Sequence, residues 1–155
     1  MGTLSTEYIL RMWLAINITI RGKKSKLLKI LLLFLAGGFG YYLLEVLFRG
    51  HSHWTMGLCG GICLVGIYFI NRRFAKSSYT LRATLCTVLI TAVEFAAGCI
   101  LNLWLGLSIW DYSALPYNLL GQISLLFSSI WFFLSFGICI LISAIENRKR
   151  KPKVS

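Results

Sequence analysis

The chain has 155 residues, of which 57% are hydrophobic and 14% are charged, with five acidic side chains against 16 basic ones. Soluble domains are roughly half apolar, so this composition excludes an ordinary soluble protein and indicates a membrane protein. The net charge of +11 does not indicate a nucleic-acid partner. The basic residues cluster at the ends of apolar segments, where anionic lipid headgroups account for them.

The first segment, residues 1–26, is amphipathic and ends in a basic cluster. Its apolar run is short and is interrupted by Glu7, Arg11 and Asn17. We predict an interfacial helix with Trp13 at the level of the headgroups, and a frayed tail is the alternative. Because the basic residues follow the apolar run instead of preceding it, we expect no cleavable signal peptide.

Four apolar segments follow, each close to the ~20 residues that a helix needs to cross a bilayer. They predict membrane helices over roughly residues 27–48, 55–70, 81–107 and 119–145. The predicted fold is therefore all-α, with a four-helix transmembrane domain over residues 27–146 and a basic tail over residues 147–155. Glycines in the first two helices allow close helix packing; they are Gly37, Gly38, Gly40, Gly57, Gly60 and Gly61.

The basic residues predict the orientation of these helices. Of the 16 Lys and Arg residues, all but Arg49 fall on the same side of the apolar segments. The positive-inside rule then places both termini in the cytoplasm, and the segment around Trp110 outside. We expect a multi-pass protein of the cell (cytoplasmic) membrane.

Two carboxylates, Glu45 and Glu94, lie inside predicted membrane helices. Carboxylates there are costly and normally face a bundle interior or a wet cavity, where they mark pathways and relays. Glu45 precedes Arg49 by one turn, so a purely structural ion pair is an open alternative. Glu94 has no basic residue within two turns, and a hydrogen-bonded helix clamp is its structural alternative. A stripe of small and polar residues continues its helix face; they are Thr87, Thr91, Gly98 and Asn102.

The segment from Trp110 to Gln122 is polar and aromatic, although it joins two apolar helices. We expect Asp111, Tyr112 and Asn118 to fold over Glu94, which would line a cavity open to the outer face and within reach of Glu45. The structural alternatives are a turn cap for Asp111, a helix cap for Asn118 and an interfacial belt for the aromatic residues. The candidate solute- or ion-binding residues are Glu45, Arg49, His53, Trp54, Glu94, Trp110, Asp111, Tyr112, Asn118 and Gln122.

Other chemistries have weaker support in the sequence. His51 and His53 do not have the spacing of a specific metal site, and we expect neither metal nor cofactor. All five cysteines fall within apolar segments, so we expect small buried side chains and no disulfide. The phosphate-binding loop, the nucleophile elbow and the zinc-protease motif do not occur in the sequence.

A combination of these motifs resembles the ABC-transporter type IV (CmpB-like) family of bacterial integral membrane proteins, from about Leu31 to about Leu134. The matching residues are Gly38, Tyr41, Glu45, Arg49-Gly50, Ser52-His53-Trp54, Met56, Gly60-Gly61, Thr91, Glu94, Gly98, Asn102, Trp110-Asp111-Tyr112-Ser113, Asn118 and Gly121-Gln122. The resemblance implies a small integral membrane protein and favours transport. Four helices are few for a permease, however, and no segment that would couple to an ATPase is identifiable.

Our preferred functional hypothesis is a permease-like protein that binds or moves a small solute or ion at its intramembrane carboxylates. We expect a homo-oligomer, because four packed helices leave little interior for a path. A membrane-embedded enzyme for a lipid or lipid-linked substrate at the outer leaflet is the alternative, although on balance we do not expect an enzyme. A regulatory subunit of a membrane complex is a third hypothesis, with a partner at the loop from Asn71 to Arg82.

Overall fold

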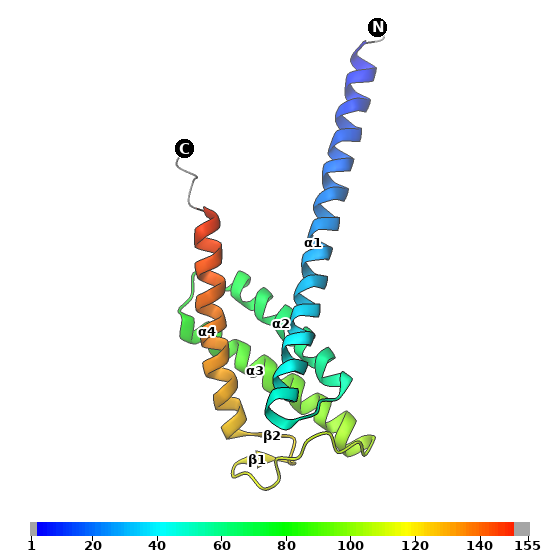
Figure 1. Ribbon diagram of the computed structural model, residues 1–155. Helices are drawn as coiled ribbons and strands as arrows, with labels where there is room; N and C mark the ends of the chain where they lie inside the picture. Colours follow the sequence, from blue (N-terminus) through cyan, green and yellow to red (C-terminus); the bar gives the residue numbers. More distant parts are fainter. Residues whose placement is uncertain (1–2, 151–155) are drawn as a thin grey trace.

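The computed structural model describes the backbone of residues 3–150 and the side chains of residues 24–145. Its elements are α1 (Thr3–Arg49), α2 (Trp54–Arg73), α3 (Tyr79–Gly98), the π-helix η1 (Cys99–Trp104), β1 (Asn118–Leu119), β2 (Ile123–Ser124) and α4 (Leu125–Arg150) (Figure 1). Four helical stretches are long and apolar enough to cross a membrane: Lys24–Arg49, Trp54–Arg73, Tyr79–Trp104 and Leu125–Ile145. The prediction of an all-α, multi-pass membrane protein is confirmed.

Helix α1 runs without interruption from Thr3 to Arg49, so the segment before the first membrane span is helical. The side chains of residues 1–23 lie outside the described part of the structure, and the interfacial position of this segment stays a prediction. The start of α1 and the end of α4 lie at the same end of the molecule (Figure 1).

Glycines bring α1 and α2 into backbone contact. The sequence predicted a close neighbour for the first helix, and the structure identifies it as α2. A Cβ atom added to Gly38 would lie 2.7 Å from the carbonyl oxygen of Gly57, and one added to Gly60 would lie 2.7 Å from that of Gly37. Any side chain at these positions would push the helices apart. Small residues therefore hold α1 and α2 as a tight hairpin, where packing drives association within lipid.

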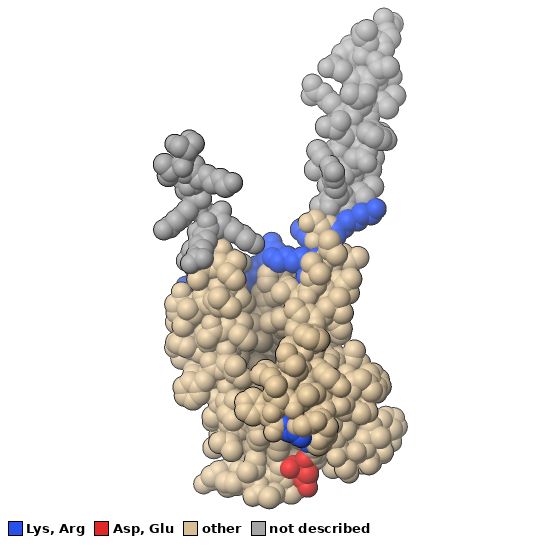
Figure 2. Space-filling view, in the orientation of Figure 1, with Lys and Arg blue, Asp and Glu red and all other residues tan. Residues whose placement is uncertain are grey.

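The second hairpin consists of α3 and α4, and the two hairpins meet mainly through α2 and α3. A small core joins Ile67 of α2, Cys86 of α3 and Cys139 of α4. Helices α1 and α4 diverge on one side of this core (Figure 1). Figure 2 shows a hollow on the face between them.

The boundaries predicted for the last two helices were wrong. The third membrane helix ends at Trp104, and α4 begins at Leu125 because the preceding residues form a β-hairpin. In that hairpin Asn118 pairs with Ser124 and Leu119 with Ile123. Leu120 and Gly121 make the turn in the left-handed region, with φ values of 52° and 69°. Leu119 and Leu120 are apolar enough to suggest helix, but this turn ends any helix there.

The helix-cap role considered for Asn118 was also wrong. Its Oδ1 accepts a hydrogen bond from the backbone N–H of Gly121 at 3.0 Å, within the hairpin turn. Ser124 occupies the position before α4, and its Oγ accepts from the N–H of Phe127 at 3.4 Å. Ser124 therefore supplies the acceptor that a helix start requires.

Candidate functional site

Asn102, in η1, fastens the outer loop to the membrane bundle. Its Oδ1 accepts from the N–H of Ile109 at 2.7 Å. Its Nδ2 donates to the carbonyl oxygen of Trp110 at 2.9 Å and to Oε1 of Gln122 at 2.8 Å. The indole of Trp110 donates in turn to the carbonyl oxygen of Gln122 at 3.0 Å. Since Trp110 and Gln122 are each only 4% exposed, the loop forms a packed cap and not a loose connection.

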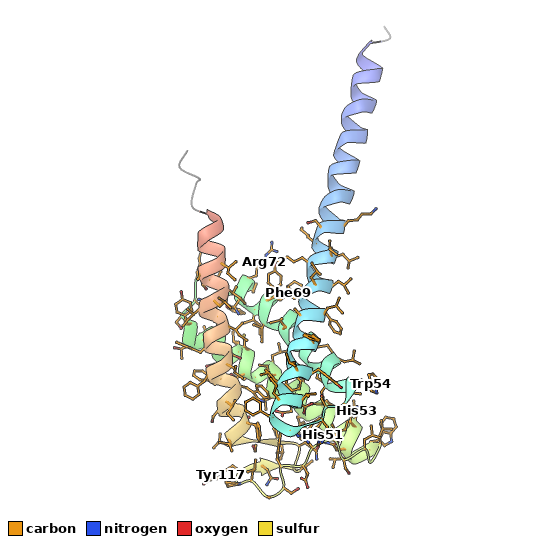
Figure 3. The ribbon with its side chains drawn as sticks, in the orientation of Figure 1. His51, His53, Trp54, Phe69, Arg72 and Tyr117 are labelled. Carbon is orange, nitrogen blue, oxygen red and sulfur yellow. The ribbon has the colours of Figure 1, made fainter. Side chains whose placement is uncertain are left out.

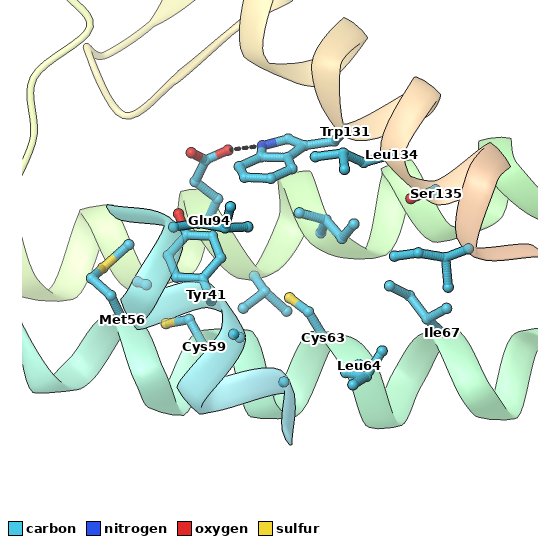
Figure 4. A pocket seen from close by; sticks show the side chains of 18 of the residues that line it. Tyr41, Met56, Cys59, Cys63, Leu64, Ile67, Glu94, Trp131, Leu134 and Ser135 are labelled. Carbon is cyan, nitrogen blue, oxygen red and sulfur yellow. Dashed lines mark hydrogen bonds between the residues drawn. The ribbon is translucent and has the colours of Figure 1, made fainter. Parts of the chain in front are cut away.

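Glu94 lies beneath this cap and is 7% exposed. The hydroxyl of Tyr112 donates to its Oε1 at 3.0 Å, and the indole N–H of Trp131 donates to its Oε2 at 3.1 Å (Figure 4). The Tyr112 ring stacks on Phe127, with the ring centroids 4.4 Å apart. Burial, and then the nearby Glu94 carboxylate, raise the pKa of Tyr112 above its ordinary value. Tyr112 therefore stays protonated and donates to Glu94 at neutral pH.

Glu94 also lines a cavity of about 240 Å³ between α1 and α4 (Figure 4). The walls are mostly apolar and come from all four helices. They include Ala36, Gly37, Gly40, Tyr41, Leu44, Met56, Cys59, Gly60, Cys63, Leu64, Ile67, Ile90, Val93, Ala97, Trp110, Trp131, Leu134, Ser135 and Ile138. The Tyr41 and Trp131 rings lie 5.9 Å apart, centroid to centroid. Among the described side chains, the buried hydroxyl of Ser135 has no hydrogen-bond partner.

Glu45 has different surroundings, although it is similarly buried. Arg49 Nη1 donates to its Oε1 at 2.8 Å, and the Ser52 hydroxyl donates to its Oε2 at 2.5 Å. Arg49 Nη2 also donates to the carbonyl oxygen of Ile109 at 2.7 Å, which ties the end of α1 to the outer loop. Glu45 is not among the residues that line the cavity. Its geometry matches the structural ion pair left open by the sequence.

The remaining candidate residues divide between the outer loop and the membrane surface. Asp111 is exposed and accepts from the backbone N–H and the hydroxyl of Ser113, which lower the pKa of its carboxyl. Asn118 donates to the carbonyl oxygens of Ser113 and Leu115. Neither side chain bonds to Glu94 in the described structure.

His53 and Trp54 lie at the start of α2 (Figure 3). The Nδ1 of His53 lies 2.7 Å from Oγ1 of Thr55. Trp54 is 66% exposed, and two other aromatic residues of this end, Trp104 and Tyr117, are also strongly exposed. These exposed rings fit the interfacial belt better than a ring-lined site.

The structure thus brings three of the predicted residues together: Glu94 and Trp110 line the cavity, and Tyr112 bonds to Glu94. Trp131 and Ser135 are functional candidates that the sequence did not indicate. A tryptophan prefers the membrane interface, whereas Trp131 falls in the middle of the predicted 119–145 helix. A tryptophan so far from the interface indicates a side chain that packs inside the bundle. Ser135 follows Trp131 by one turn, on the same helix face.

The described residues hold no group of three or more His, Cys, Asp or Glu side chains arranged to bind a metal ion. The five cysteines are free thiols, and Cys59 and Cys63 lie in the cavity wall. The polar chemistry of the cavity therefore rests on Glu94, the two donors that bind it, Ser135 and the hydroxyl of Tyr41.

Comparison with known proteins identifies the family of the chain. The sequence model of the family described as "Putative ABC-transporter type IV" matches residues 32–152. The chain belongs to this family. The match takes in α2, α3, the outer loop, all of α4 and the part of α1 that lines the cavity. It confirms the resemblance seen in the sequence. No curated protein and no solved structure matches the chain.

Proposed function

We propose that the chain is a permease-like membrane protein that binds a small organic cation in the cavity between α1 and α4. The observation that carries this proposal is the environment of Glu94, a buried carboxylate on an apolar cavity. Its two hydrogen-bond donors, Tyr112 and Trp131, are neutral. No described Lys, Arg or His forms an ion pair with it. A buried carboxylate needs a compensating charge or a proton, and a bound cation supplies the charge.

The walls of the cavity favour an organic cation over a bare metal ion. Ca²⁺ and Mg²⁺ require about six or more oxygen ligands, while Glu94, Ser135 and the phenol of Tyr41 supply the few side-chain oxygens here. The Tyr41 and Trp131 rings border the same space as Glu94. Aromatic faces attract alkylammonium groups, and apolar walls accommodate the carbon chain of such a solute. A carboxylate accepts up to about four hydrogen bonds, so Glu94 retains capacity beyond its two donors.

The divergence of α1 and α4 supports entry of the solute from within the membrane. These helices pack on α2 and α3 respectively, and the cavity lies between them. An amphiphilic cation partitions into the bilayer and reaches the opening from the side. In this proposal the chain is a homo-oligomer of the cell membrane, and a second copy completes the path across the bilayer.

We also propose that both termini are cytoplasmic and that the loop from Trp110 to Gln122 is outside. The described Lys and Arg side chains gather at the end where α1 starts and α4 ends, apart from Arg49 (Figure 2). A cysteine at exposed Ala114, in a variant without the five native cysteines, should react with an impermeant thiol reagent added to whole cells. Labelling of this position only after permeabilisation would reverse the orientation.

Binding of hexyltrimethylammonium to the purified full-length chain tests the function. We expect saturable binding that Glu94→Gln weakens by at least about tenfold, since a charge pair in a low-dielectric site is worth more than one factor of ten. Asp111→Asn is the matched control, because Asp111 is an exposed acid outside the cavity wall, and it should bind like the unmodified protein.

Uptake of the same cation into proteoliposomes tests movement. Glu94→Gln should reduce uptake to the rate of protein-free liposomes, while Asp111→Asn keeps it. Hexanol has a similar chain without the charge, and it should not compete. Equal binding by Glu94→Gln, or equal competition by hexanol, would reject the organic-cation proposal.

A further inference from the structure

At the end of the molecule opposite Glu94, two basic side chains from different helices converge on one phenol. Lys29 Nζ of α1 donates to the Tyr68 hydroxyl at 3.0 Å, and Arg72 Nη1 of α2 donates to the same oxygen at 3.2 Å. The Lys29 ammonium also lies 4.3 Å from the centroid of the Tyr68 ring. Both cations are exposed, whereas Tyr68 is buried beneath them. Two positive charges thus share one neutral oxygen.

A third cation, Arg82 of α3, lies at the same end and is 4% exposed. It donates to Oδ1 of Asn71 at 3.2 Å and to the hydroxyl of Ser143 at 3.0 Å, both neutral groups. Its buried Nε–H has no hydrogen-bond partner among the described side chains. Among the described side chains no carboxylate lies beside this guanidinium. A buried guanidinium without an anion is costly, so the described residues at this end leave a demand for negative charge unmet.

The acidic residues with described side chains cannot meet this demand. Glu45 lies 16 residues after Lys29 on the same helix, about 24 Å along the axis. Glu94 and Asp111 lie at the same end as Glu45. Tyr112, next to Asp111 in the outer loop, donates to Glu94, and Arg49, the partner of Glu45, donates to Ile109 of the same loop. The described part of this basic cluster, defined as Lys29, Tyr68, Arg72 and Arg82, therefore contains donors and positive charge but no carboxylate.

The basic cluster continues directly into the apolar cavity wall. Leu64 lies one turn before Tyr68 on α2, and Ala36 lies two turns after Lys29 on α1; both line the cavity. Figure 3 places Arg72 above the gap between α1 and α4, and Figure 2 shows basic side chains beside the hollow there. A polar site for an anion and an apolar groove thus follow each other along one face.

We propose that this face binds one anionic phospholipid, with its phosphate at Lys29 and Arg72 and an acyl chain in the groove between α1 and α4. Charge-assisted hydrogen bonds from ammonium and guanidinium groups suit a phosphate. Basic pockets between membrane helices bind anionic headgroups in this way. The adjoining groove distinguishes a lipid from free phosphate, because only a lipid fills both parts. The phosphate-binding residues, Lys29 and Arg72, are not part of the cation site, although the acyl chain would share the cavity wall at Ala36 and Leu64. The proposal does not depend on cation binding.

Retention of lipid by the purified full-length chain tests this site. Detergent-solubilised protein is mixed with equal amounts of phosphatidylglycerol and phosphatidylcholine of the same acyl chains, and bound lipid is measured by native mass spectrometry. We expect one phosphatidylglycerol per chain, and at least about a tenfold loss in the double variant Lys29→Gln/Arg72→Gln, because each basic residue adds a comparable increment of attraction.

Two control variants separate this site from general surface charge. Arg73→Gln removes the neighbouring guanidinium, which lies over the Phe74 ring at 5.7 Å, and Lys24→Gln removes a lysine of α1 from outside the cluster. Both should retain phosphatidylglycerol like the unmodified chain. Equal losses in the controls, equal retention of phosphatidylcholine, or unchanged binding by the double variant would overturn the proposal.

Tyr68→Phe separates an anion site from a mere tyrosine clamp. This change frees both cations but keeps the ring, so it should retain phosphatidylglycerol. Loss of binding would show that the freed cations do not hold a phosphate by themselves, and it would overturn the assignment of the phosphate to Lys29 and Arg72. Inorganic phosphate provides the last arm: displacement of the lipid by phosphate at equal concentration would identify a soluble anion and overturn the lipid. Circular dichroism checks that every variant keeps its helices.

Discussion

Two buried carboxylates of similar exposure, Glu45 at 9% and Glu94 at 7%, have opposite surroundings. Glu45 accepts from a guanidinium and a hydroxyl, and both donors lie within seven residues of it in the chain. Glu94 accepts from Tyr112 in the outer loop and Trp131 in α4, which are 18 and 37 residues away. One carboxylate is balanced locally, while the other is held by neutral donors from distant elements and faces a cavity.

The difference shows why burial alone does not identify a functional carboxylate. A paired carboxylate with satisfied oxygens stabilises the fold, and the Glu45–Arg49 pair also fixes the outer loop through Ile109. A carboxylate with acceptor capacity left, and with a cavity beside it, can take part in binding. Three predictions test this contrast, from the largest expected effect to the smallest.

Breaking the Glu45 pair should cost the most stability. Arg49→Gln leaves a buried carboxylate without its cation and removes the bond to the Ile109 carbonyl oxygen. We expect the free energy of unfolding in detergent to fall by about 2–3 kcal/mol, the cost of stranding a buried charged group. Because Glu45 does not line the cavity, cation binding by the folded fraction should be unchanged.

The double variant Glu45→Gln/Arg49→Gln is the control for direct pairing. Removing both charges should recover part of the loss seen in Arg49→Gln, giving a coupling energy on the order of 1 kcal/mol or more. Strictly additive losses in the thermodynamic cycle would mean that the two groups do not interact. The structural assignment of Glu45 would then fail.

The second prediction concerns the attachment of the cap above Glu94. A Cβ atom at Gly98 would lie 2.6 Å from Oε1 of Gln122 and 2.8 Å from its Cβ. Gly98→Val should displace Gln122 and weaken its bond with Asn102, at a cost of about 1–2 kcal/mol. Thermal unfolding measures this loss. The native thiol of Cys59, in the cavity wall, should then react faster with a small thiol reagent than it does in the unmodified chain.

Gly137→Val provides the matched control, because a Cβ atom there meets nothing within 4 Å and Gly137 does not line the cavity. It should change both stability and Cys59 reactivity much less than Gly98→Val. Similar effects of the two substitutions would mean that the cap does not depend on the fit between Gly98 and Gln122.

The sequence predicted the features that local chemistry determines. Hydropathy located the four spans, the glycines of the first helix predicted a closely packed neighbour without identifying it, and i,i+4 spacing identified the Glu45–Arg49 pair. The prediction from the sequence failed where contacts between distant residues determine the structure. The residues from Asn118 to Ser124 are apolar enough for helix, but a left-handed turn makes them a hairpin.

The site was predictable only in part for the same reason. The stripe through Glu94 and Gly98 indicated an inward face, and Tyr112 was correctly placed over Glu94. Trp131 comes from a helix whose rotation about its axis depends on packing against α3, which the sequence pattern does not specify. The cavity exists because α1 and α4 diverge, and that divergence is a property of the whole bundle.

The smallest expected effect concerns the hydroxyl of Tyr112, the loop's own contact with Glu94. Tyr112→Phe removes one donor from Glu94 but leaves the ring stacked on Phe127, so we expect a loss of about 1 kcal/mol at neutral pH. The same residue predicts a pH dependence. Burial and the Glu94 carboxylate raise the pKa of folded Tyr112 above its ordinary value of 10.0, so the unfolded chain releases this proton first.

The stabilising contribution of Tyr112 is therefore complete below pH 10 and is lost as the pH rises above it. Tyr112→Phe has no phenol to ionise, so its stability should fall less steeply than that of the unmodified chain in this range. Denaturant unfolding at several alkaline pH values measures the difference. Tyr117→Phe is the control, because Tyr117 is an 82% exposed tyrosine of the same loop, and this variant should follow the pH profile of the unmodified chain. Parallel pH profiles for the unmodified chain and Tyr112→Phe would mean that the phenol is not held against the carboxylate. The contrast between Glu94 and Glu45 could then no longer rest on a hydrogen bond from the outer loop to Glu94.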